Sequence, residues 1–343
     1  MKKQIIKTFF FLAVFLMLPN FSQAAIVFED NFDASPDWQS AESYPSANAI
    51  WPNTWKDKAG GPSQPPPQNW TSYRAAIPRW LHDSTFILGS EGARDGIGKG
   101  MTYNLDPPGC YGGGCWVGGG LDLSLGDAGY QEIYVRFYLK YDPNTFHWGT
   151  IIPNYALQKL IRISRFKVPL TLSSSPQNFS NGDQTPTFYP DFHNDPNLAS
   201  NKVHFEPGHV FDPVGGGLIS EYGGQIPWPT DGEWHSYEFR VKMNSSPGVA
   251  DGEWEFWLDD LSDSSHHMLS TSLAWVGSES LTTPGWNWLT VLDNMTNLSD
   301  SQYYDTVMKL FMDDFVVSTS YIGTEAPVVD VTAPAAPTGL SVE

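Results

Sequence analysis

The chain has 343 residues, with 38 acidic and 19 basic side chains and a formal net charge of −19. This acidic balance leaves no basic field to neutralise phosphates and argues against non-specific nucleic-acid binding. A hydrophobic content of 41% supports a folded core and excludes global disorder.

The first 24 residues have the features of a secretory signal. Three lysines lie within the first seven residues, an apolar run covers 8–18, and Ser22, Gln23 and Ala24 provide a cleavage position. The apolar run is too short to cross a bilayer, and no later stretch approaches the roughly 18 residues needed. We therefore expect a secreted protein, extracellular or periplasmic, without a membrane span.

Residues 25–323 are predicted to form one all-β domain. Frequent glycine, proline and aromatic residues are typical of short strands joined by turns. Long Pro/Gly/Asn-rich stretches, such as 60–69 and 173–201, are predicted to be loops. Alternating or β-rich runs predict strands at Ala25–Phe32, Gln131–Tyr141, Lys159–Phe166, His235–Met243, Glu253–Leu258 and Lys309–Ser318.

The two cysteines, Cys110 and Cys115, flank a Tyr-Gly-Gly-Gly segment. Such a flexible segment can bring their Cα atoms within disulfide range. In an exported chain we expect this pair to form a loop-stapling disulfide.

The run 134–141 alternates between apolar and polar residues. A period of two places Val135, Phe137 and Leu139 on a core face. The other face would present Arg136, Tyr138 and Lys140, which could hold an acidic sugar chain; a solvated outer face is the alternative.

The hairpin at 231–260 carries a resemblance to a known family. It reads Gly-x-Trp-His, an alternating strand, a turn, Asp-Gly, a second alternating strand and Leu-Asp. This hairpin resembles that of concanavalin A-like jelly rolls, which include laminin-G domains, legume lectins, glucanases and polysaccharide lyases. The segments 28–33 and 312–323 resemble the first and last strands of that fold. The resemblance implies a concanavalin A-like jelly-roll β-sandwich of two antiparallel sheets with long loops, whose terminal strands pair.

Pairing of the termini would bring acidic residues together. Carboxylate oxygens are suitable ligands for a structural Ca²⁺ ion, as in related sandwiches. We therefore expect a calcium site, with a solvated acidic patch as the alternative; the candidate ligands are Glu29, Asp30, Asp313 and Asp314, with Asp33 nearby.

Among jelly rolls, the segments 134–143, 146–148 and 158–163 resemble those of alginate-lyase-type and glucuronan-lyase-type enzymes. β-Elimination at a uronic acid needs a cation on the sugar carboxylate, a base for the C5 proton and an acid for the leaving oxygen. Residues of suitable type predict catalytic roles for Lys159, Arg162, Tyr138 and His204, and substrate contacts for Arg136, Lys140, His147 and Trp148. On a regular strand, Lys159 and Arg162 would face opposite sides, so both could serve one site only across a bulge.

Other functions stay open at this point. A glycosidase would need two flanking carboxylates, for which Glu253 and Glu255 share a face. A metal site near His204 and Glu206 lacks a third ligand. A non-catalytic glycan-binding module would use tryptophans in loop-like sequence: Trp51, Trp55, Trp70, Trp80, Trp116, Trp148, Trp228, Trp286 and Trp288. The tail 324–343 resembles the start of a fibronectin type III module and suggests a surface adhesive protein as a third class.

Overall fold

The computed structural model describes the chain in separate stretches. These are residues 25–40, 66–74, 84–105, 116–117, 120–145, 157–166, 186–193, 202–210, 218–220, 225–227, 231–259, 266–277, 285–292, 295–296 and 307–323. The predicted signal segment and the tail beyond Gly323 lie outside them. Within these stretches, no helix is long and apolar enough to cross a membrane.

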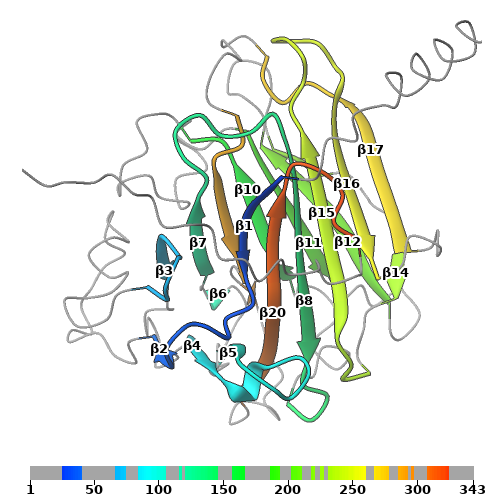
Figure 1. The fold of residues 1–343 in the computed structure, drawn as a ribbon. Helices are drawn as coiled ribbons and strands as arrows, with labels where there is room; N and C mark the ends of the chain where they lie inside the picture. The colour runs from blue at the N-terminus through cyan, green and yellow to red at the C-terminus, as the bar shows by residue number, and fades with distance from the viewer. Residues whose placement is uncertain are drawn as a thin grey trace, which may run out of the picture.

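Two antiparallel sheets form the fold (Figure 1). Sheet A has the strand order β17-β16-β15-β8-β20-β5-β4-β2, and β1 also pairs with β20. Its strands are β17 (His267–Leu273), β16 (Gly252–Leu258), β15 (His235–Lys242), β8 (Glu132–Tyr141), β20 (Met308–Ser318), β5 (Gly100–Leu105), β4 (Ser84–Gly89), β2 (Trp38–Gln39) and β1 (Ile26–Asp30).

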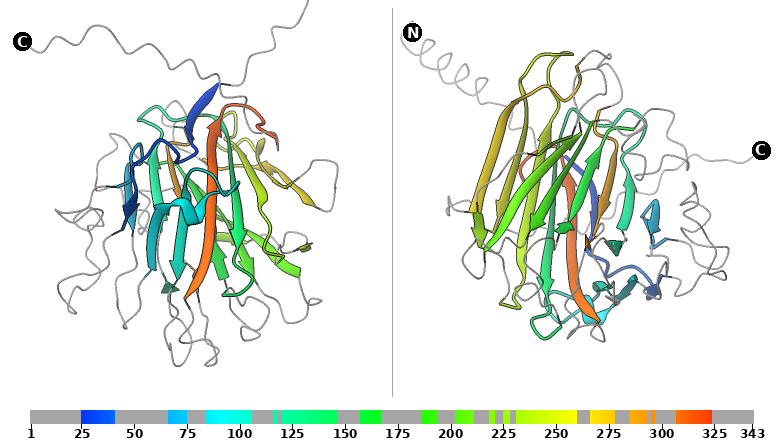
Figure 2. Two further views of the ribbon diagram at one scale, coloured as in Figure 1. Left: turned by 60° about the horizontal axis from the view of Figure 1, so that its bottom comes forward. Right: turned by 180° about the vertical axis from the view of Figure 1, so that it is seen from behind.

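Sheet B lies behind sheet A and faces the viewer in the right-hand panel of Figure 2. Its main order is β3-β7-β18-β10-β11-β9-β19-β6; β12 pairs with β11, β13 and β14. The strands are β3 (Ser72–Arg74), β7 (Gly120–Ser124), β18 (Trp288–Val291), β10 (Ile161–Ser164), β11 (Thr187–His193), β9 (Leu157–Lys159), β19 (Met295–Thr296), β6 (Trp116–Val117), β12 (Lys202–Val210), β13 (Leu218–Ser220) and β14 (Gln225–Pro227).

The core lies between the two sheets, and both contribute alternate residues to it. Val135, Phe137 and Leu139 of β8 are fully buried in the same apolar cluster as Ile161 and Ile163 of β10. Each sheet therefore has an inner face on the core and an outer face that points away from the other sheet. The predicted β-sandwich of two antiparallel sheets is confirmed.

The terminal strands pair as predicted. Glu29 lies opposite Val316, and Asp30 lies opposite Phe315 in β20. The first and last described strands of the domain therefore lie together in the middle of sheet A, where Figure 1 shows β1 beside β20.

One predicted loop contains a strand. Residues 187–193, within the proline-rich stretch 173–201, form β11 in the interior of sheet B, with β10 and β9 on one side and β12 on the other. Pro190 pairs with Pro207 in register. Proline is rare inside sheets because it cannot donate a backbone hydrogen bond, so its presence here concealed the strand.

Candidate functional site

A β-bulge between β9 and β10 determines where Lys159 and Arg162 lie. Ile163 pairs with Phe188 and Lys159 pairs with Asp191, so four steps along one strand match three along its partner. The consecutive residues Leu160 and Ile161 both enter the core. The extra residue reverses the alternation, which is what a bulge does to a strand.

Lys159 and Arg162 consequently meet at one aromatic ring on the outer face of sheet B. The Nζ atom of Lys159 lies 4.8 Å from the centre of the Tyr189 ring, and the Cζ atom of Arg162 lies 5.9 Å from it. Lys159 is partly exposed, whereas Arg162 and Tyr189 are buried. We call Lys159, Arg162 and Tyr189 the sheet B cluster.

Tyr189 is positioned by the alternation of β11. Its neighbour Phe188 belongs to the core, so Tyr189 points to the outer face. One step along that face, the Thr187 hydroxyl donates to Ser164 Oγ at 3.0 Å. A tyrosine hydroxyl and a lysine amine can each give or accept a proton, so this cluster combines one guanidinium with two groups capable of acid–base chemistry.

A buried carboxylate lies on the same outer face of sheet B, two strands away from Arg162. Arg162 pairs with Thr290, and Thr290 pairs with Asp122 in β7. The Thr290 hydroxyl donates to Asp122 Oδ1 at 2.6 Å, and Asp122 is 2% exposed. The outer face of sheet B therefore changes from cationic to anionic over three adjacent strands.

His204 lies in the same sheet by register. It is in β12, opposite His193 of β11, and two positions from Glu206, which pairs with Asp191. The side chains of β12 lie outside the described set, so His204 is placed on this sheet by its backbone alone.

The predicted residues of β8 lie on the other sheet. Arg136, Tyr138 and Lys140 point to the outer face of sheet A, away from Lys159 and Arg162. Arg136 is fully buried, and its Nη1 atom donates to the Gly323 carbonyl at 2.7 Å. Burial lowers the pKa of Arg136, opposed by the charges of Tyr138 and Glu238. Arg136 is therefore covered in this structure by a later segment of the chain, and its contact with substrate stays a prediction.

Tyr138 and Lys140 also have partners within the protein. The guanidinium carbon of Arg94 lies 3.9 Å from the centre of the Tyr138 ring. The Lys140 Nζ lies 5.2 Å from the Trp234 ring and 4.9 Å from the Phe311 ring. Among the predicted residues whose side chains the structure describes, Lys159 and Arg162 therefore lie on one outer face, and the three residues of β8 lie on the opposite one.

The predicted calcium ligands lie close in the sheet, and three of them, Asp30, Asp313 and Asp314, are engaged by protein donors. Asp30 accepts from Trp70 Nε1 at 2.9 Å. Asp314 pairs with Arg94 at 2.6 Å, and Asp313 accepts from the backbone N–H groups of Arg94 and Asp314. In the stretches that the structure describes, no three His, Cys, Asp or Glu side chains gather to hold a metal ion. Calcium binding stays a prediction.

Several predicted residues lie outside the described stretches. These include His147, Trp148 and the cysteines Cys110 and Cys115, so their roles stay predictions. Of the loop tryptophans, Trp70, Trp286 and Trp288 are buried. These three pack against the sandwich and do not form an exposed stacking surface.

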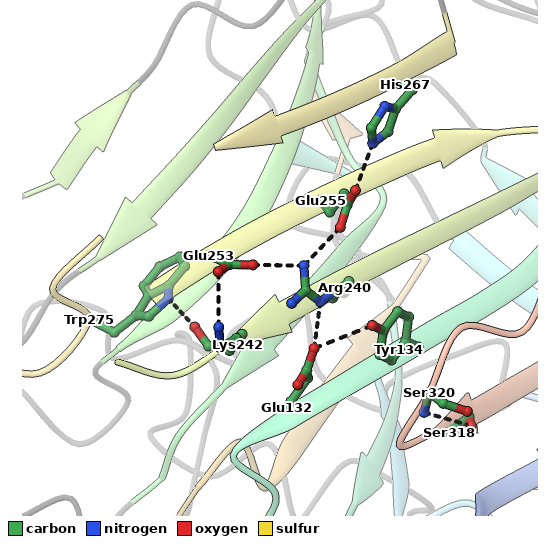
Figure 3. Close-up of polar contacts among 10 residues, drawn as sticks. All are labelled: Glu132, Tyr134, Arg240, Lys242, Glu253, Glu255, His267, Trp275, Ser318 and Ser320. Atoms are coloured by element: carbon green, nitrogen blue, oxygen red, sulfur yellow. Dashed lines mark hydrogen bonds and ion pairs between the residues drawn. The ribbon is translucent and has the colours of Figure 1, made fainter. Parts of the chain in front are cut away.

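The glycosidase candidates belong to an ion-pair network on the outer face of sheet A (Figure 3). One atom of Arg240, Nη1, lies 2.8 Å from both Glu253 Oε2 and Glu255 Oε2, and its Nε bonds Glu132 at 2.6 Å. His267 extends the network to Glu255 at 2.8 Å, and Lys242 bonds Glu253 at 2.9 Å. Both carboxylates are held by cations, which favours a structural role over a pair flanking a glycosidic bond.

His235 ties the start of β15 to the end of β16. Its Nδ1 lies 2.7 Å from Asp259 Oδ2, and its Nε2 lies 3.1 Å from Asp231 Oδ1. Burial alone would lower the pKa of His235, but the two carboxylates outweigh it and raise the pKa. His235 thus connects the residues before β15 with those after β16 in the hairpin 231–260.

Sequence reasoning missed Tyr189, Thr290 and Asp122. Tyr189 lies in the stretch predicted to be a loop, where the alternation of Thr187, Phe188 and Tyr189 was the available signal. No local pattern relates Asp122 to Thr290, because 168 positions separate them.

Comparisons with known proteins found no matching family model and no matching curated relative. Among solved structures, a PL-14 alginate lyase from Aplysia kurodai is similar at 10% identity and a TM-score of 0.43, covering 68% of this chain and 87% of that one. Alginate lyase Aly36B in complex with alginate tetrasaccharide is similar at 14% identity and a TM-score of 0.41, covering 84% and 95%. A GH131 β-glucanase catalytic domain from Podospora anserina is similar at 12% identity and a TM-score of 0.43, covering 88% and 99%.

Proposed function

We propose that this protein is a secreted, carbohydrate-active enzyme that cleaves an acidic extracellular polysaccharide by β-elimination at the sheet B cluster. The observation that carries the proposal is the bulge that brings Lys159 and Arg162 to the Tyr189 ring from one side of the strand. The predicted signal segment supports an extracellular site of action.

Each group has a role in the proposed reaction. Arg162 pairs with the uronate carboxylate, which makes the adjacent C5–H bond more acidic. The unprotonated amine of Lys159 takes the C5 proton, and the bonding electrons form the C4–C5 double bond. The C4–O4 bond breaks, and the Tyr189 hydroxyl donates its proton to the leaving oxygen. The products are an unsaturated uronate end and a new reducing end, with no cofactor consumed.

Ultraviolet absorbance tests the proposal, because the new double bond is conjugated with the carboxylate. The full chain is assayed on polyuronates, glycosaminoglycans and a neutral glucan, with Ca²⁺ and with a chelator. We expect a rise on at least one polyuronate that Lys159→Ala abolishes. The matched control is Lys242→Ala, which removes a lysine from the outer face of sheet A and should leave the rate unchanged.

A flat trace on every polyuronate would overturn the lyase proposal. If glycan affinity persisted, the protein would be a non-catalytic glycan-binding module. If glycan affinity were also absent but the protein bound cells or matrix, the adhesive function suggested by the tail would replace the lyase proposal.

A further inference from the structure

The segment Ser320–Gly323, which we call the strap, lies across the outer face of sheet A. A single carboxylate holds two successive backbone N–H groups of this segment. Ile322 N–H donates to Glu238 Oε1 at 2.8 Å, and Gly323 N–H donates to Glu238 Oε2 at 2.9 Å. Arg136 Nη1 donates to the Gly323 carbonyl at 2.7 Å. Three adjacent main-chain groups are therefore bound by two side chains that face each other across β8 and β15.

An aromatic surface beside this pair receives the strap's side chain. The Tyr321 ring centre lies 5.1 Å from that of Trp257 and 6.5 Å from that of Tyr134. The Trp257 ring also stacks on His267, with 5.5 Å between the ring centres. Figure 3 shows Tyr134 and His267 on the same face, with Ser318 and Ser320 where the chain turns off β20. The turn is closed by Ser320 N–H donating to Ser318 Oγ at 3.1 Å.

The contacts are charged and buried, which distinguishes them from a loosely packed chain end. Arg136 is 0% exposed and Glu238 is 2% exposed. Burying such polar groups is costly unless their hydrogen-bonding capacity is filled. The strap fills part of it, and the bond from the Arg136 guanidinium to the Gly323 carbonyl is charge-assisted and stronger than a neutral one. An open strap would leave both side chains without those partners, so the closed position is favoured.

One strap position restricts the sequence that the site accepts. Gly323 has a φ of 79°, a conformation that residues with a Cβ atom rarely adopt. The site therefore favours glycine at position 323.

We propose that Arg136, Glu238, Tyr134 and Trp257 form a main-chain binding site for Tyr321–Gly323, which fixes the direction in which the chain leaves the sandwich. Gly323 lies on the outer face of sheet A, opposite to the sheet B cluster. This proposal does not depend on the lyase activity.

Amide hydrogen exchange of the full chain tests the site. In the wild type, Ile322 and Gly323 amides should be protected. Glu238→Gln replaces one acceptor oxygen with a donor that repels the strap amides, so their exchange should accelerate at least tenfold. The matched control is Glu253→Gln, which alters another outer-face carboxylate of sheet A and should leave strap exchange unchanged. Equal strap protection in the wild type and Glu238→Gln would overturn the proposal, as would equal loss in both variants.

Gly323→Ala covers the case in which Glu238→Gln disturbs the sheet itself. If the β15 amides of Tyr237 and Phe239 also lose protection in Glu238→Gln, Gly323→Ala decides, because it leaves every sheet residue in place. Faster exchange at Ile322 in this variant supports the site; unchanged exchange overturns it.

Discussion

Lys159 and Arg162 lie on the same face of sheet B although they are three positions apart. One extra residue between them, with Leu160 and Ile161 both entering the core, reverses the alternation. A regular strand would have put one of the two cations into the core. The bulge is the local feature on which the proposed reaction depends.

Tyr189→Phe should separate chemistry from binding. The variant keeps the ring that Lys159 and Arg162 contact and removes only the proton donor. We expect kcat on the active polyuronate to fall by about 10²–10⁴-fold with little change in KM. Tyr134→Phe, on the outer face of sheet A, is the control and should keep the wild-type rate. A Tyr189→Phe variant with full activity would remove Tyr189 from the mechanism.

Stability should fall as pH rises toward neutrality. Burial raises the pKa of Glu238 from 4.5 to about 7, opposed by the amides of Ile322 and Gly323 and by Arg136. The folded state thus holds a proton that the unfolded state releases near pH 4.5, so this contribution is complete below that pH and is lost as pH rises to about 7. Asp313 should contribute to the same pH dependence of stability, because burial raises its pKa from 3.8 to about 7.

Denaturant unfolding between pH 4.5 and 7.5 measures this dependence. In Glu238→Gln the decline over this window should shrink by about 3 kcal/mol, since each pKa unit corresponds to about 1.4 kcal/mol. An unchanged pH slope in both Glu238→Gln and Asp313→Asn would contradict the assignment.

Arg240 should contribute more to stability than its neighbour Lys242. Arg240→Met leaves Glu132, Glu253 and Glu255 without their shared cation, and its side chain is 14% exposed. We expect a loss of about 1–3 kcal/mol in the free energy of unfolding. Lys242→Met removes one ion pair from a side chain that is 38% exposed, so its loss should stay below about 1 kcal/mol. Equal losses would show that the network does not act through Arg240.

Gly92 and Gly89 provide a matched pair for backbone packing. Gly89 precedes the short 3-10 helix η2 (Ser90–Gly92), and Gly92 is its last residue. A Cβ atom on Gly92 would lie 2.5 Å from the carbonyl carbon of Gly100, which cannot move without shifting β5. Gly92→Ala should therefore cost about 1–3 kcal/mol. At Gly89 a Cβ atom meets nothing within 4 Å, so Gly89→Ala should leave the melting temperature nearly unchanged. A larger loss at Gly89 would contradict this local packing.

Regular alternation made most of sheet A predictable. The runs 131–141, 235–243, 253–258 and 309–318 match β8, β15, β16 and β20 to within one residue at each end. Each places large apolar side chains on one face, and burial of that face is what stabilises a strand in a sandwich. The pairing of the termini followed from the resemblance and is also confirmed.

The site was less predictable because it depends on contacts distant in sequence. Arg136 donates to the carbonyl of Gly323, which is 187 positions away. The stretch around Tyr189 contains Pro186 and Pro190, which have the signature of a loop, although β11 is an interior strand. The need for a bulge between Lys159 and Arg162 followed from their spacing, but its presence depends on how β9 and β10 both pair with β11.

The most direct test compares one polyuronate with its carboxyl-reduced form, with ultraviolet absorbance and reducing ends followed together. Elimination needs the carboxylate, which Arg162 is proposed to bind. The account predicts that both signals rise in parallel on the native polymer and that neither rises on the reduced one. Reducing ends without absorbance would indicate hydrolysis, and no cleavage of any polyuronate would leave the sheet B cluster without the proposed chemistry.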